Sequence, residues 1–147
     1  MPRIDIDDPE VEAGYVLLYR GEPFTGEVEE RMGGVVISRD SYVDGVLHGD
    51  CREWYQDGTL HSEGTARTGR PAGVSRTWHP NGMLASEHVF SDDGLTLLEE
   101  RRWDEQGQAT KDWREGRRAG AWARRWPGAV LVWWIPVPGR TGLRWRA

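Results

Sequence analysis

The chain contains a single cysteine, Cys51, among 147 residues, so no disulfide can form within it. A lone cysteine is typical of proteins from a reducing compartment, and we expect a cytoplasmic location. Residues 1–8 lack the basic region and the apolar stretch of a secretory signal. The most apolar stretch, 129–138, has ten residues and two prolines, whereas a membrane-spanning helix needs about 20. The sequence therefore predicts a protein that stays in water.

Motifs that carry catalysis or bind metals are also missing. The four histidines form no His-Glu-x-x-His motif and have no pair of cysteines beside them, so no metal site is expected. No serine lies in a Gly-x-Ser-x-Gly elbow, and no glycine-rich turn is followed by the Lys-Ser or Lys-Thr of a phosphate loop. Cys51 has no distinctive base beside it, so we expect an inert thiol. We expect no enzymatic activity, no catalytic residues and no cofactor.

Lysine and phenylalanine are rare, whereas arginine and tryptophan are abundant. One Lys stands against eighteen Arg, and two Phe against nine Trp. Arg suits planar pairing and stacking, and large indole rings would supply much of the buried area. Residues 1–50 hold 12 acidic and 4 basic side chains, net −8, whereas residues 51–147 hold 12 and 15, net +3. An acidic N-terminal part would attract a basic partner and repel nucleic acid, although a solubilising surface explains the charge equally well.

Glycines recur along the chain with a step of 24 residues. Trp54 and Trp78 keep this step, whereas Trp103 and Gly107 are displaced by one residue. Such a period is typical of a repeat array in which each unit packs mainly on its neighbours. An array offers a long surface rather than a closed pocket, which favours a binding protein. The glycines that keep the step are Gly21, Gly45 and Gly69, then Gly49 and Gly73, and then Gly34, Gly58 and Gly82.

Each repeat contains the signal of a β-hairpin. Asp57-Gly58 lies between alternating stretches at about 49–56 and 59–66, and Asp-Gly is typical of a two-residue type I′ turn with positive φ at both positions. We expect the link 67–73 to lead to the next hairpin at about 74–90. His48 is expected in a tight turn before Gly49. The expected structural turn residues are Gly45, Gly49, Asp57, Gly58, Gly69, Gly73, Asn81, Gly82 and Gly107.

No segment has a sustained helical period, and Pro or Gly interrupts most windows. The sequence therefore predicts an all-β fold, an extended, twisted antiparallel sheet of tandem β-hairpin repeats with a period of about 24 residues. Three parts are expected. These are an acidic N-terminal arm at 1–14, an array of about four repeats at 15–115, and a degenerate fifth repeat with an Arg/Trp-rich cap or tail at 116–147.

A two-residue turn fixes which residues face each other across a hairpin. It places Trp54 opposite His61 and Arg52 opposite Glu63. One face of the sheet would then carry a row of Trp beside a row of Arg–carboxylate pairs. The later repeats would place Trp78 opposite Ala85, Arg76 opposite Glu87, Trp103 opposite Thr110 and Arg101 opposite Asp112. The candidate partner-binding residues are Trp54, Trp78, Trp103, Arg52, Arg76, Arg101, Glu63 and Glu87.

Two interpretations of the Trp row remain open. Each indole could pack on the neighbouring hairpin and fix the curvature of the sheet. Alternatively, exposed indoles and arginines could anchor a partner, as these residue types do at binding hot spots. The acidic residues 7–12 likewise fit either a nucleic-acid mimic that blocks a basic cleft or a solvated arm. The stretch 130–136 fits either an end cap or a segment that is association-prone or poorly ordered.

The repeat resembles the MORN-variant repeats of YwqK-type bacterial antitoxins. One copy reads Tyr42…Gly45…Gly49…Trp54-Tyr55…Asp57-Gly58…Leu60, and the next reads Gly69…Gly73…Trp78-His79…Asn81-Gly82…Leu84. The segment 22–26 is similar to the opening segment of such proteins, and the resemblance covers residues 15–115. Ala66 departs from the pattern because it replaces the leading aromatic, and Glu30-Arg31 replaces the aromatic pair of the first copy.

The resemblance implies a cytoplasmic protein that neutralises a cognate bacterial toxin. Our first hypothesis is therefore an antitoxin or immunity protein that binds a toxin protein and no nucleic acid. The alternative is a MORN-like scaffold or peripheral membrane protein that binds anionic lipid through residues 122–145. The net acidity of residues 1–115 disfavours this alternative. Open sheet ends could permit a weak homodimer.

Overall fold

A computed structural model describes residues 1–116 as strands and turns without a helix. The predicted cap or tail at 116–147 lies outside the described residues except for Gly116. The strands are β1 (Arg3–Asp5), β2 (Val11–Glu12), β3 (Leu18–Tyr19), β4 (Glu22–Pro23), β5 (Gly26–Met32), β6 (Val35–Val43), β7 (Val46–Trp54), β8 (Leu60–Arg67), β9 (Arg70–Trp78), β10 (Leu84–Phe90), β11 (Leu97–Trp103) and β12 (Ala109–Arg114).

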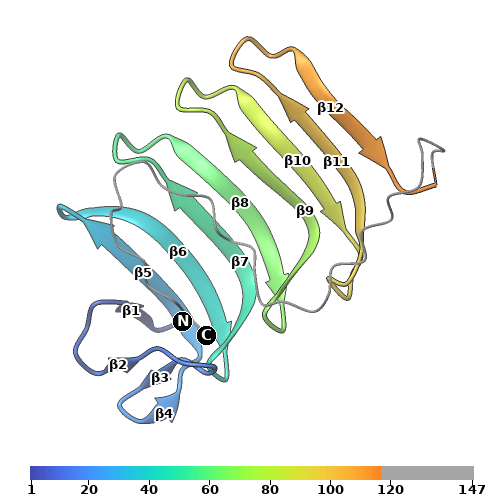
Figure 1. Ribbon diagram of the computed structural model, residues 1–147. Helices are drawn as coiled ribbons and strands as arrows, with labels where there is room; N and C mark the ends of the chain where they lie inside the picture. Colours follow the sequence, from blue (N-terminus) through green and yellow to red (C-terminus); the bar gives the residue numbers. More distant parts are fainter. Residues whose placement is uncertain (117–147) are drawn as a thin grey trace.

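The main sheet has nine strands in the order β1-β5-β6-β7-β8-β9-β10-β11-β12. From β5 onward every strand pairs antiparallel with the next one in the chain, whereas β1 pairs parallel with β5. Figure 1 shows the hairpins following one another as a twisted sheet that does not close into a barrel. The predicted all-β sheet of tandem hairpins is therefore confirmed.

The type I′ turns lie at the other end of the hairpins from the one predicted. Asp44-Gly45 joins β6 to β7 with φ of 50° and 75°, and Thr68-Gly69 joins β8 to β9 with φ of 52° and 76°. The expected link at 67–73 is therefore wrong, because Arg70–Gly73 belongs to β9. His48 lies within β7 rather than in a turn. Its Nδ1 accepts a hydrogen bond of 3.2 Å from the backbone N–H of Thr68, so it supports the turn of the next hairpin.

The turn at Asp57-Gly58 is a three-residue loop rather than the predicted two-residue turn. Tyr55 N–H donates to the Thr59 carbonyl at 2.8 Å, and Gly58 N–H donates to the Tyr55 carbonyl at 2.9 Å, which draws Gln56 into the loop. Only Gly58 has positive φ, because the Asp57 carboxylate accepts the Thr59 N–H at 2.8 Å and holds a type I turn. The loops around Asn81-Gly82 and Gln106-Gly107 repeat these backbone bonds.

Each of these hairpins also contains a β-bulge. The pairing passes from Glu53 opposite Ser62 to Trp54 opposite Leu60, so His61 is an extra residue on β8. The prediction that Trp54 faces His61 is therefore wrong. Trp78 and Trp103 likewise face Leu84 and Ala109 instead of Ala85 and Thr110.

The predicted Arg pairs are confirmed despite the bulges. Arg52 lies opposite Glu63, Arg76 opposite Glu87, and Arg101 opposite Asp112. The loop removes one residue from the first strand and the bulge adds one to the second. These two irregularities cancel beyond the bulge, so the register deeper in the hairpin is unchanged.

The displacement of the fourth repeat by one residue arises between β10 and β11. Phe90 pairs with Leu97, and the loop between them is closed by a hydrogen bond of 2.9 Å from Ser91 N–H to the Thr96 carbonyl. This connection is longer than the two-residue turns at Asp44-Gly45 and Thr68-Gly69. The pairing of the following strands is nevertheless antiparallel and continuous.

The acidic N-terminal segment is folded against the first hairpin. Besides β1, it contributes β2, which forms a small sheet with β3 and β4. Leu17, Phe24 and Val28 form a buried cluster, and the turn at Gly45 is bonded to the Leu17 and Phe24 backbones. The partly buried residues packed on this cluster are Ile4, Ile6, Val11, Tyr19 and Tyr42. This end of the array is therefore the thickest part of the described core.

Candidate interaction face

A single row of charged side chains crosses the sheet from β7 to β12. Neighbouring residues of the row are direct cross-strand partners, both within each hairpin and between hairpins. Its charges alternate strictly, with an arginine on every odd-numbered strand and a carboxylate on every even-numbered strand. We call this set the charge row, and it consists of Arg52, Glu63, Arg76, Glu87, Arg101 and Asp112.

The sequence predicted only the pairs within each hairpin, and the structure links them across hairpins. Arg76 Nε lies 2.9 Å from Glu87, which is a hydrogen-bonded ion pair. The Arg52–Glu63, Arg76–Glu63 and Arg101–Glu87 contacts are longer, at 3.9 Å each. Side-chain exposure along the row ranges from 19% at Glu87 to 57% at Asp112. Such exposed pairs contribute little stability, so their main consequence is a patterned surface.

The predicted Trp row lies on the same face as the charge row. The Arg39 guanidinium lies 5.6 Å from the centre of the Trp54 ring, and Arg39 is the cross-strand partner of Arg52. Trp78 and Trp103 follow Arg76 and Arg101 by two residues on their strands, which places them on this face as well. All three indoles are half-buried. We call this side of the sheet the row face.

The row face carries two shallow hollows. One of ≈ 200 Å³ is lined in part by Arg52, Glu63 and Val74, and the other, of ≈ 280 Å³, is lined in part by Val35, Arg39 and Trp54. Pockets that enclose small molecules usually measure about 300–1,000 Å³. These two are smaller, and they better fit side chains inserted by a protein partner.

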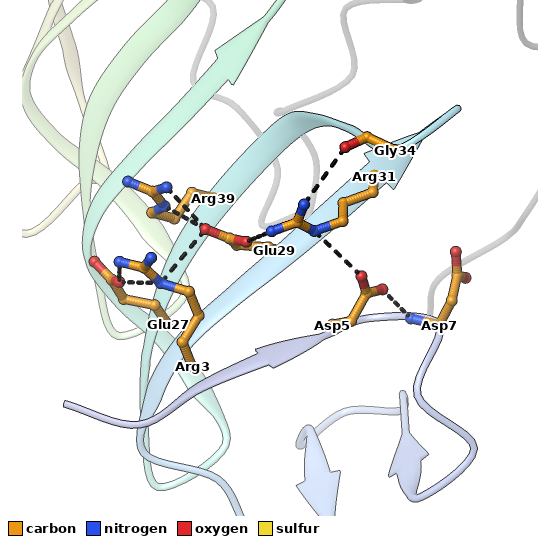
Figure 2. Close-up of polar contacts among 8 residues, drawn as sticks. All are labelled: Arg3, Asp5, Asp7, Glu27, Glu29, Arg31, Gly34 and Arg39. Carbon is orange, nitrogen blue, oxygen red and sulfur yellow. Dashed lines mark hydrogen bonds and ion pairs between the residues drawn. The ribbon is translucent and has the colours of Figure 1, made fainter.

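A buried carboxylate that sequence reasoning missed continues the row face toward β1. Glu29 on β5 is only 4% exposed and lies 2.8 Å from Arg31 and 2.8 Å from Arg39, with Arg3 at 3.4 Å (Figure 2). Burial favours the protonated acid, but the hydrogen bonds from Arg39 and Arg31 prevail and lower the pKa of Glu29 below its ordinary value. Arg3 could not be anticipated because β1 joins β5 from a distance of more than twenty residues. Arg39 faces Glu29 within the first hairpin because of a bulge between Glu30 and Arg31, which the sequence pattern did not reveal.

The opposite face carries a second set of polar contacts. The Glu53 carboxylate bonds the His61 ring at 3.1 Å and accepts a hydrogen bond of 3.2 Å from the Ser62 hydroxyl. Ser62 is only 1% exposed, whereas a serine nucleophile must be within reach of its substrate. Farther along, Glu100 accepts a hydrogen bond of 2.5 Å from Lys111. Burial opposes ionisation of Glu100, but Lys111 and Arg102 keep its pKa below its ordinary value.

Cys51 is buried on this opposite face. Burial, reinforced by nearby Asp40, raises the pKa of its thiol far above the ordinary value. The thiol is therefore protonated at neutral pH and is a poor nucleophile or metal ligand. Among residues 1–116, no group of three or more His, Cys, Asp or Glu side chains is arranged to hold a metal ion.

Comparisons with known proteins do not add to these observations. A scan against protein-family models, a search of curated proteins and a search of solved structures each returned no match. The resemblance to YwqK-type antitoxins therefore stays a prediction from the sequence. In the described part of the chain, no helix is long and apolar enough to cross a membrane.

Proposed function

We propose that this chain is a non-enzymatic binding protein of the antitoxin or immunity type. It neutralises a bacterial toxin by covering part of the toxin surface with the row face. The observation that carries the proposal is the charge row, which spans six strands beside three half-buried indoles. The antitoxin class itself comes from the resemblance of the repeats.

The chemistry of the row face suits a protein partner. Arginine and tryptophan are the residue types most enriched at binding hot spots, and the two occur here side by side. An alternating row fixes the register of a bound partner, because a shift by one strand would place like charges together. The two hollows of ≈ 200 and 280 Å³ add places for inserted side chains.

A growth assay tests the proposed class. The full chain is co-expressed with the product of the adjacent gene in a bacterium that this product arrests. We expect the chain to restore growth and to co-purify with the toxin as a complex of fixed stoichiometry. An adjacent product that causes no arrest, or an arrest that the chain does not relieve, would contradict the antitoxin assignment.

Liposome co-sedimentation tests the alternative of a peripheral membrane protein. We expect the full chain to stay in the supernatant with vesicles containing about a third anionic lipid. Salt-sensitive binding that disappears on deletion of residues 116–147 would support the membrane alternative instead.

A further inference from the structure

The order of charges in the charge row is self-complementary. From β7 to β12 the signs run plus, minus, plus, minus, plus, minus. Read from β12 back to β7, every sign is inverted. A second row placed over the first in reverse order would therefore bring each arginine over a carboxylate. The midpoint of the charge row lies between Arg76 on β9 and Glu87 on β10.

We propose that the row face binds a second copy of this chain, face to face, about a two-fold axis that runs parallel to the strands between β9 and β10. This axis places Arg52 over Asp112, Glu63 over Arg101, and Arg76 over Glu87 of the other copy. A two-fold axis along the row would instead place each charge over its own counterpart. Electrostatics thus select one of the two face-to-face arrangements.

The apolar residues beside the charge row fit the same arrangement. Trp54, Trp78 and Trp103 lie on β7, β9 and β11, and their cross-strand partners on β8, β10 and β12 are Leu60, Leu84 and Ala109. The axis exchanges odd-numbered with even-numbered strands. Each indole of one copy would therefore lie over a smaller apolar side chain of the other copy, and the indoles would interdigitate instead of colliding.

The contacts along the row leave hydrogen-bonding capacity for this partner. Three of the arginine–carboxylate contacts measure 3.9 Å, which is too long for a hydrogen bond. The side chains in these contacts remain between 19% and 49% exposed. A carboxylate from the second copy can therefore accept N–H groups that are not bonded along the row.

The size of the overlap makes the dimer weak and sensitive to salt. Six strands span roughly 24 Å across the sheet, and the row with its indoles covers a band only about 10 Å deep. The area of this band is well below the roughly 800 Å² that each partner buries in a standard interface. We expect self-association only above about 0.1 mM at low ionic strength, and dissociation at about 0.5 M salt.

Charge-reversal variants test the arrangement by sedimentation equilibrium of the full chain. Arg76→Glu places Glu over Glu87 of the other copy, and Glu87→Arg places Arg over Arg76, so each variant alone should be monomeric. An equimolar mixture of the two should dimerise, because both central contacts then join opposite charges. Circular dichroism spectra that match the wild type would show that the variants are folded.

The double variant Arg76→Glu/Glu87→Arg keeps opposite charges paired between β9 and β10. It also places like charges beside Glu63 and Arg101, so its circular dichroism spectrum is compared with that of the wild type. It should self-associate as the wild type does. However, it should not form mixed dimers with labelled wild-type chain, because Arg then faces Arg and Glu faces Glu. The proposal does not rest on the antitoxin function, since no toxin takes part in these measurements.

Three results would overturn the proposal. The wild type could stay monomeric at about 0.5 mM and low salt. The Arg76→Glu variant could dimerise as strongly as the wild type, as a dimer joined through the sheet ends would. The double variant could form mixed dimers freely with the wild type.

Discussion

Among residues 1–116, Thr68 is the residue whose side chain suits its backbone conformation least. Its φ is 52°, in the left-handed region that β-branched residues rarely adopt. Asp44, at the equivalent place one repeat earlier, is a residue type that tolerates this region better. The turn at Thr68 is kept because its N–H bonds His48 and because Gly69 N–H bonds the Leu47 carbonyl.

Replacing Thr68 by Asn should therefore stabilise the protein. We expect the free energy of unfolding to rise by about 1 kcal/mol, measured by urea denaturation at neutral pH. Thr65→Asn is the matched control, because Thr65 lies within β8 and has no positive φ. An equal change in both variants would contradict the role of backbone strain.

Glu29 gives the protein a stability that depends on pH. Its pKa in the folded state lies below the ordinary value, so the folded state favours the ionised form. The contribution is present above the unfolded-state pKa of about 4.3 and is lost as the pH falls through the folded-state value. Glu29→Gln should therefore lower the free energy of unfolding by about 2 kcal/mol at pH 7, because it removes the carboxylate that accepts hydrogen bonds from Arg31 and Arg39.

Urea denaturation at several pH values checks this expectation. The difference between wild type and Glu29→Gln should shrink as the pH falls from about 5 to 3. Glu27→Gln is a suitable control, since Glu27 pairs with Arg3 at a more exposed place. A difference that stays constant with pH would show that the loss is one of packing and not of charge.

At the scale of the hairpin, side chains of one repeat form hydrogen bonds with the backbone of the next repeat. The Tyr55 hydroxyl donates to the Trp78 carbonyl at 2.9 Å, and the His79 ring bonds the Trp103 carbonyl at 2.9 Å. The Asn81 amide donates to the Glu105 carbonyl at 2.9 Å, while its oxygen accepts the Met83 N–H within its own turn. These bonds align consecutive hairpins and explain why polar residues recur beside each turn.

Asn81→Asp separates the two functions of this side chain. The aspartate keeps the acceptor for Met83 N–H but has no donor for the Glu105 carbonyl, so we expect a loss of about 1 kcal/mol in urea denaturation. Asp57→Asn is the matched control, because within residues 1–116 the Asp57 side chain bonds only inside its own turn, to Thr59, and the substitution should be nearly neutral. The idea fails if both substitutions change stability equally.

The hairpins also show how far the sequence determines the fold. The 24-residue glycine step and the Asp-Gly pairs were sufficient to predict an open sheet of hairpins. They did not reveal which glycine of each repeat makes the tight turn, because Asp44-Gly45 and Asp57-Gly58 carry the same sequence signal. The pairing of Arg52 with Glu63 was predicted correctly because the extra loop residue Gln56 and the bulge residue His61 cancel at that depth. Trp54 lies between the loop and the bulge, so its partner was predicted wrongly.

For the whole molecule, the contacts that the sequence did not predict join residues that are far apart in the chain. Arg3 reaches Glu29, beside Arg31 and Arg39 of the first hairpin, only because β1 adds to the edge of the sheet beside β5. A parallel contact of this kind leaves no periodic trace in the sequence. The charge row also joins residues that are far apart in the chain. It is nevertheless visible in the sequence, because Arg52, Arg76 and Arg101 recur at nearly equal steps.

One calorimetric titration tests most directly whether the row face is the binding surface. The product of the adjacent gene that the chain rescues from growth arrest is purified. It is titrated into the full chain, into Arg52→Ser/Arg76→Ser/Arg101→Ser, and into the control Arg67→Ser/Arg70→Ser, whose exposed arginines flank the turn at Thr68-Gly69. We predict at least a roughly tenfold weaker affinity for the triple variant and an unchanged affinity for the control. A triple variant that binds the toxin as tightly as the wild type would contradict the account.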